Sequence, residues 1–193
     1  MNLLVVGDGE LDARTLPSLI RMILGRELRA TTRNWRELHL LGGNGYAKKL
    51  QYLAKECNHA GLDGVVAVVD RDKDAKSRRI QDLRRGREES LSRPPIAIGQ
   101  ADPHGEAWLL DDPVAVARTL RLDSSTPVPS VSKSKSPKDE LNALHAISPR
   151  ATERRGEVLG EIAAAVQLKR CTHAKSSGLA AFADDLRAEF PRP

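Results

Sequence analysis

The sequence is poor in cysteine and in aromatic residues. Its 193 residues include two cysteines, Cys57 and Cys171, and only 3% are Phe, Trp or Tyr. Cysteines without partners at metal-ligand spacing argue against a zinc site and favour reduced thiols in a cytoplasmic protein. So few aromatic rings argue against the stacking surface of many single-strand binders. Any contact with nucleic acid is therefore expected with its phosphate backbone.

Long hydrophobic runs are also missing. No apolar stretch approaches the length that crosses a membrane, which predicts a protein without a membrane partner. Met1 leads directly into the strand-like apolar residues 3–6 rather than into a signal peptide. Hydrophobic residues at 40% and charged residues at 30% are typical of a globular protein. At this length we expect one domain, or one domain with a small appendage.

The most informative segment is 64–74, in which five small or β-branched apolar residues end in an acidic stretch. Such a run suits a strand buried on both faces. Side chains alternate along a strand, so Asp70 and Asp72 are expected on one side and Arg71 on the other. Two carboxylates at the carboxyl end of a parallel strand begin a site for Mg²⁺ or Mn²⁺. A plain turn is the alternative, whereas a calcium loop is excluded because its sixth position is Ala75.

The remaining apolar pattern alternates between short strands and amphipathic helices. The predicted strands are 2–6, a segment within 29–41, 64–69 and 94–99, and helices are predicted at 16–24, 46–60 and 77–89. Strands that alternate with helices indicate an α/β fold with a mainly parallel, Rossmann-like sheet of four strands flanked by helices.

A run rich in Ser, Pro and Lys divides the chain. We predict a first domain at 1–121, a flexible linker or loop at 122–137 and a helical C-terminal subdomain at 138–193. Within the last, helices are predicted at 138–146, 154–168 and 179–190. Contact with nucleic acid and plain solubility explain the lysines of the linker equally well.

Acidic side chains follow three of the predicted strands: Asp8, Glu10 and Asp12, then Asp70 and Asp72, then Glu106. In a parallel sheet with right-handed crossovers, these strand ends meet at one edge. Metal-assisted phosphoryl chemistry needs such a convergence, because carboxylates hold the metal and another acid accepts a proton. Two structural alternatives stay open: Asp12 as the cap of the first helix, and Glu106 as a carboxylate favoured by a helix dipole.

The net charge of +5 is modest but unevenly distributed. A basic run is usually the solvated face of a helix. Beside an acidic metal site, it also suits a polyphosphate backbone. The run consists of Lys76, Arg78, Arg79, Arg84, Arg85 and Arg87.

Two segments resemble the motifs of the Toprim domain, which occurs in topoisomerases, bacterial primases and the overcoming-lysogenisation-defect (OLD-like) nucleases. Residues 5–12 are similar to a strand ending in Glu-Gly-x-x-Asp, and 68–72 to a strand ending in Asp-x-Asp. The run Glu-Ala-Trp-Leu-Leu-Asp-Asp at 106–112 looks like one in small stand-alone bacterial Toprim proteins, as do 137–138 and 171–186. The resemblance covers most of the chain and is strongest from residue 3 to residue 110.

The resemblance implies a Toprim-like fold and a Mg²⁺- or Mn²⁺-dependent endonuclease that hydrolyses phosphodiester bonds of nucleic acid, DNA foremost. Bacterial antiviral defence or repair, beside an ATPase partner, is the implied setting. The implied catalytic residues are Asp8, Glu10, Asp70 and Asp72. The implied metal ligands are Asp8, Asp70, Asp72 and Glu106. Contacts with nucleic acid are expected from Lys76, Arg78, Arg79 and Lys138.

One position departs from the family pattern. Asp8 stands where the family has a glutamate, and its side chain is one methylene shorter. Either Glu10 takes over, or Asp8 works with a shifted metal, or activity is weak.

Two other functions stay open. The departure at Asp8 favours a catalytically degenerate Toprim module that binds nucleic acid or a partner protein. A phospho-acceptor receiver domain is the weakest fit, because it expects a lone aspartate where Asp70 and Asp72 stand together. A homo-oligomer is compatible with each of these hypotheses.

Overall fold

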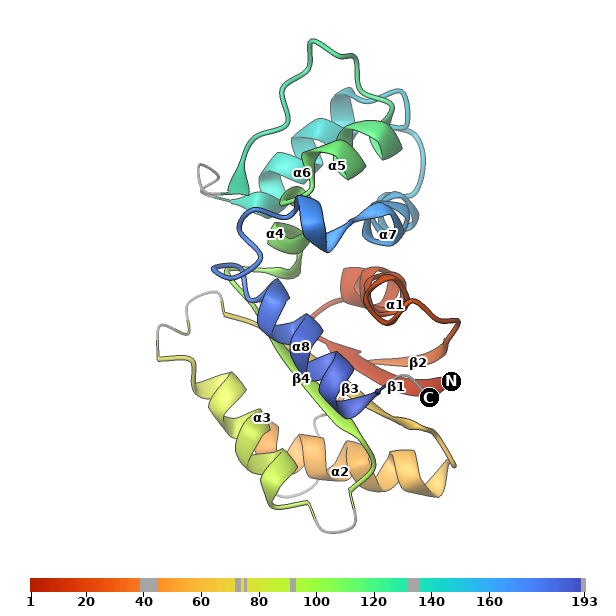
Figure 1. The fold of residues 1–193 in the computed structure, drawn as a ribbon, viewed down its shortest axis with the longest axis vertical. Helices are drawn as coiled ribbons and strands as arrows, with labels where there is room; N and C mark the ends of the chain where they lie inside the picture. The colour runs from red at the N-terminus through yellow and green to blue at the C-terminus, as the bar shows by residue number, and fades with distance from the viewer. Residues whose placement is uncertain (39–44, 72–73, 75, 91–92, 132–135, 192–193) are drawn as a thin grey trace.

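The computed structural model describes residues 1–38, 45–71, 74, 76–90, 93–131 and 136–191, with only the backbone described at Glu10 and Leu11. Four strands form one parallel sheet in the order β2-β1-β3-β4 (Figure 1). The predicted α/β fold with a four-stranded, Rossmann-like sheet is therefore confirmed. The strands are β1 (Asn2–Gly7), β2 (Arg29–Asn34), β3 (Gly64–Asp70) and β4 (Ile96–Ala101).

Helices cover both faces of the sheet, with α1 on one face and α2 and α3 on the other (Figure 1). Alternation along β1 explains the two layers. Leu3 and Val5 join the core beneath α1, whereas Leu4 and Val6 join the core beneath α2. The helices of the described chain are α1 (Glu10–Leu24), α2 (Tyr46–His59), α3 (Arg78–Glu88), α4 (Gly105–Leu110), α5 (Pro113–Leu120), α6 (Pro137–Ile147), α7 (Arg155–Ala165), the short 3₁₀ helix η2 (Leu168–Arg170) and α8 (Leu179–Glu189).

The C-terminal helices share a core with the sheet. Ile162 of α7 and Phe182 of α8 belong to the same buried cluster as Leu3 of β1. Phe182 approaches β4 closely, because a Cβ atom at Gly99 would lie 2.6 Å from its ring. The division of the chain at 122–137 stays a prediction.

Helix α8 also shields the open edge of the sheet. The N–H of Ile98 donates to Asp185 Oδ2 at 2.7 Å, and the N–H of Ile96 donates to Glu189 Oε2 at 3.0 Å. Both amides belong to β4, the last strand of the sheet, where an exposed row of donors invites pairing with another chain. Two carboxylates of one helix thus take the place of a fifth strand.

The boundaries differ from the predicted ones where tertiary contacts intervene. β4 begins at Ile96 rather than at residue 94, because the two preceding prolines have no N–H to donate to a ladder. α7 ends at Ala165 rather than at residue 168, since Val166 is buried in a non-helical conformation and Asp112 accepts the N–H of Gln167. α5 was not predicted, although Asp112 and Pro113 give it a sequence signal for a helix start.

No helix in the described parts of the chain has the length and apolar character needed to cross a membrane.

Candidate functional site

Four acidic side chains line one pocket of about 790 Å³ at the carboxyl ends of the strands. Asp70 is the last residue of β3, and Asp8 follows directly after β1. Asp12 lies in the first turn of α1, and Glu106 lies in α4, the helix after β4. Parallel pairing of β3 with both β1 and β4 brings these ends together. The structure thus gathers described members of all three predicted acidic clusters.

Short hydrogen bonds fix the acids on the β1 side of the pocket. The N–H of Asp70 donates to Asp8 Oδ2 at 2.6 Å. Asp12 Oδ2 in turn accepts the N–H groups of Asp8 at 2.7 Å and Gly9 at 3.1 Å. Asp12 therefore helps to cap α1 from within its first turn, as the acid of a capping box, whereas the N-cap residue itself is Gly9. Gly7 makes room for this carboxylate, because a Cβ atom there would lie 2.7 Å from Asp12 Oδ2.

Two of the acids hold their protons unusually tightly. Burial, followed by the charges of Asp12 and Asp8, raises the pKa of Asp70 from its ordinary 3.8 to about 8. Burial also raises the pKa of Asp12 to about 6, although the backbone N–H groups that it accepts oppose the shift. Carboxylates crowded in a half-buried pocket raise one another's pKa, and a bound cation has the opposite effect.

Basic and aromatic side chains line the same pocket. Arg79 Nη1 lies 3.7 Å from Asp8 Oδ2 and donates to the carbonyl oxygen of Asp70 at 3.3 Å. Its guanidinium carbon lies 5.9 Å from the ring centre of Tyr46, and Lys49 Nζ lies 5.8 Å from that centre. Tyr46 packs edge-on against the buried Trp35, with ring centres 5.1 Å apart. The pocket therefore presents positive charge beside the acids.

The structure places some of the predicted residues in the pocket and others outside it. Arg79 and Lys138 line it, from α3 and α6 respectively. Lys76 and Arg78 are exposed and do not line it. Asp72 lies outside the described residues. Glu10 begins α1, but its side chain is not described.

Three contacts at the pocket were not predicted. His104 Nδ1 lies 3.8 Å from Asp70 Oδ2, and the N–H of Gly105 donates to Asp70 Oδ1 at 3.1 Å. Arg155 Nη2 lies 3.5 Å from Glu106 Oε1. His104 and Gly105 are next to Glu106, which the sequence had marked as a candidate site residue. Arg155 comes from α7, and nothing in the sequence marked it as part of the site.

The resemblance extends to Asp111 and Asp112, but in the structure these residues stabilise the fold and do not line the pocket. Both side chains are fully buried. Asp111 accepts the N–H of His173, and Asp112 accepts the N–H of Gln167 and the Nε–H of Arg170. The pair holds the segment that links α7 to α8.

The chemistry of the pocket donors fits a hard divalent cation. Carboxylate oxygens are the ligands that Mg²⁺ and Mn²⁺ prefer, and Mg²⁺ commonly takes one or two carboxylates together with waters and substrate phosphates. Among the described residues, no group of three His, Cys, Asp or Glu side chains is placed to hold a metal ion. Asp8, Asp70 and Glu106 thus have the right donor chemistry for Mg²⁺ but do not form a ready-made three-ligand site, and each of them already contacts another group of the protein.

No protein-family model, curated protein or solved structure matches this chain.

Proposed function

We propose that this protein is a Mg²⁺-dependent nuclease that cleaves phosphodiester bonds in DNA. One observation carries the proposal. Asp8, Asp70 and Glu106, from three separate strand ends, line a single pocket that Arg79 and Lys138 line as well. A pocket lined by acids and by cations beside them suits a metal ion together with a phosphate.

The residues divide by their chemistry. One or two of the carboxylates Asp8, Asp70 and Glu106 would hold Mg²⁺ together with waters, with Asp72 as the further ligand that the sequence predicts. Bound Mg²⁺ supplies charge neutralisation and orients the attacking water. Arg79 and Lys138 bind the phosphate oxygens, and Arg155 keeps the Glu106 carboxylate in place at 3.5 Å. Asp8, which follows β1, or Glu10, which begins α1, would accept the proton of the attacking water.

The biological setting of the proposal rests on the resemblance alone. Relatives of the OLD-like type act in defence against phage or in repair, often beside an ATPase. We propose the same setting for this protein.

A degenerate Toprim-like module that binds nucleic acid or a partner protein is the second candidate. Two observations favour it. Asp8 is shorter than the expected glutamate and already accepts the N–H of Asp70. Moreover, the described part of the chain contains no three-residue metal-binding group. In this module, Arg79 and Lys138 keep their role toward phosphate.

Metal-dependent cleavage separates the two candidates. Purified protein is incubated with supercoiled DNA, linear DNA and RNA, with Mg²⁺ or Mn²⁺, and in parallel with a chelator. If the protein is a nuclease, we expect cleavage that needs the metal and is lost in Asp70→Asn. This variant keeps an oxygen that can accept the N–H of Gly105. The matched control is Asp184→Asn, since Asp184 is an 81% exposed carboxylate of α8.

Retention of cleavage in Asp70→Asn would contradict the assigned site. Binding that survives both the chelator and Asp70→Asn, without any cleavage, identifies the degenerate module.

A further inference from the structure

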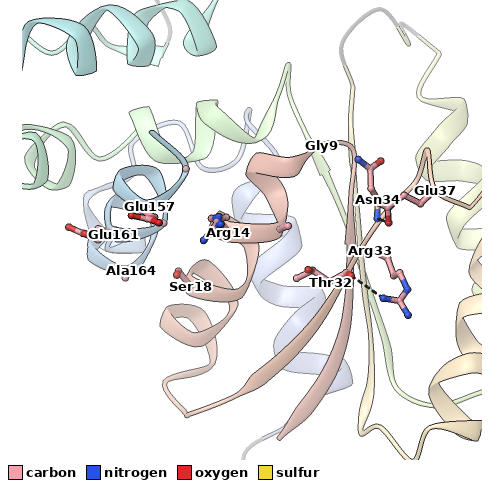
Figure 2. Close-up of a pocket in the computed structure, with 13 residues that line it drawn as sticks. Gly9, Arg14, Ser18, Thr32, Arg33, Asn34, Glu37, Glu157, Glu161 and Ala164 are labelled. Carbon is pink, nitrogen blue, oxygen red and sulfur yellow. Dashed lines mark hydrogen bonds between the residues drawn. The ribbon is translucent and has the colours of Figure 1, made fainter. Parts of the chain in front are cut away.

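A second cavity opens beside the acidic pocket. It has a volume of about 870 Å³ and lies between β2 on one side and α1 and α7 on the other (Figure 2). Gly9 and Asn34 line this cavity and also the acidic pocket. The two spaces therefore meet at Gly9 and Asn34. We call the second space the β2–α7 cavity.

Arg14 is the cation that the β2–α7 cavity offers to a ligand. Figure 2 shows its side chain between α7 and β2. It is exposed and makes no ion pair with any residue that the structure describes. Arg33 also lines the cavity, but its guanidinium is bonded to Glu56 at 2.9 Å. A ligand that enters the cavity therefore meets an available guanidinium at Arg14.

The carboxylates of the cavity already have partners. Glu161 Oε2 lies 2.5 Å from Arg150 Nη1, and its side chain points away from Arg14 in Figure 2. Glu37 accepts the N–H of Asn34, and Glu157 lies 3.9 Å from Arg154, the residue that precedes α7. Their negative charge is thus partly offset, which leaves Arg14 free to attract an anion.

Uncharged hydrogen-bonding groups complete the wall around Arg14. Ser18 and Thr32 supply hydroxyl groups, and Asn34 supplies an amide. None of the described residues that line the cavity is aromatic, which favours a ligand held through its backbone rather than by stacking. Its volume lies within the range of small-ligand pockets, about 300–1,000 Å³, which is too small for a duplex.

We propose that the β2–α7 cavity holds a single strand of nucleic acid that leaves the acidic pocket across Gly9, with Arg14 against one of its phosphates. The inference rests on the proposed function, because it takes the acidic pocket as the place where the strand is held for cleavage. It adds the direction in which the strand runs and a new residue, Arg14, that binds it.

Gly9 permits a sharp test of this path. Its backbone is extended, with φ −146° and ψ 174°, a conformation that any residue adopts. A Cβ atom added at Gly9 meets no atom within 4 Å. A side chain there therefore starts in open space, with little strain on the fold. We expect Gly9→Phe to occupy the passage, and Gly9→Ala is the matched variant that leaves it open.

The experiment measures binding of fluorescent oligothymidylates of about 2 to about 16 nucleotides, the range over which single-strand sites vary. Ca²⁺ replaces Mg²⁺ so that binding is read without cleavage. We expect wild-type affinity to rise with length and the rise to vanish in Gly9→Phe but not in Gly9→Ala. Arg14→Ala should make the slope of log affinity against log salt shallower by about 0.7, the value for one lost single-strand phosphate contact.

Arg118→Ala is the control, because Arg118 is exposed on α5 and lines neither space. An undiminished length dependence in Gly9→Phe, or an unchanged salt slope in Arg14→Ala, overturns the path.

Cleavage of supercoiled DNA by the wild-type protein is measured alongside. Cleavage without these binding effects would support the nuclease and reject the proposed path of the strand. The binding effects without cleavage would support the proposed path of the strand and reject the nuclease.

Discussion

Asp8 and Asp70 are joined by a hydrogen bond from the N–H of Asp70 to Asp8 Oδ2, with a length of 2.6 Å. The β1–β3 ladder pairs residues only as far as Val6 and Ala67, so this contact extends the link between the strands beyond the sheet. It holds two carboxyl groups close together at the pocket. Ionising both of them is costly without a cation, as the raised pKa of Asp70 shows, and the cost can be measured.

Asp70→Asn should stabilise the protein at alkaline pH. Since the pKa of Asp70 rises from 3.8 to about 8 on folding, the folded state binds more protons than the unfolded state between these values. Stability therefore falls as pH rises from about 4 to about 8, and the asparagine variant escapes this loss. Thermal unfolding of both proteins in the presence of a chelator, at pH 4 and at pH 8, checks this prediction. Each kcal/mol by which the variant is more stable should raise its Tm by about 2–4 °C.

Mg²⁺ should narrow the difference in stability between wild type and Asp70→Asn at pH 8. A cation bound to the ionised carboxylate stabilises the wild-type protein more than the asparagine variant. A wild-type protein whose stability rises from pH 4 to pH 8 as steeply as that of Asp70→Asn would contradict the assigned environment of Asp70.

Asp12→Ala should weaken the start of α1. The change removes the oxygen that accepts the N–H groups of Asp8 and Gly9. Loss of a helix cap costs about 1 kcal/mol. Asp12→Asn keeps an acceptor oxygen and should cost less. Urea unfolding at pH 5, below the pKa of about 6 where charge repulsion is small, provides the measurement. Equal stability of the two variants would argue against the capping role.

Asp185→Ala should destabilise the β4 edge. The carboxylate accepts the N–H of Ile98 and pairs with Arg87 Nη1 at 2.9 Å, so its loss leaves both donors without this partner. The expected cost is about 1–3 kcal/mol in the free energy of unfolding, read by urea titration. The neighbouring Asp184→Ala is the control, since its side chain is 81% exposed. A similar loss of stability in both variants would show that the negative charge of α8 matters, and not the contact of Asp185 with Ile98 and Arg87.

Arg170→Ala should destabilise the link between α7 and α8. Asp112 is fully buried, and Arg170 Nη2 lies 2.8 Å from its Oδ2. Removal of one partner leaves an incompletely compensated buried charge, at a cost of about 3 kcal/mol. Lys169→Ala is the control, because Lys169 is the exposed neighbour. Thermal unfolding compares them, and a Tm unchanged in Arg170→Ala would mean that water or the backbone donors suffice for Asp112.

The sequence by itself determined the sheet. The run 65–69 is apolar at every position, which favours a strand buried on both faces, as a central strand of a parallel sheet is. Once β3 is central, Asp70 has to stand at its carboxyl end, and the acids after β1 and β4 have to stand beside it. Local patterns of apolar residues and chain connectivity suffice for these conclusions.

Only the tertiary structure decided which partners the acids meet. Arg155 is 49 residues from Glu106, and Asp185 is 87 residues from Ile98, so no local pattern relates them. The cavity that reaches Arg14 exists because α7 packs on α1 beside β2. Side-chain contacts and cavities depend on how helices distant in the sequence pack together, and a single sequence specifies that packing only through the complete fold.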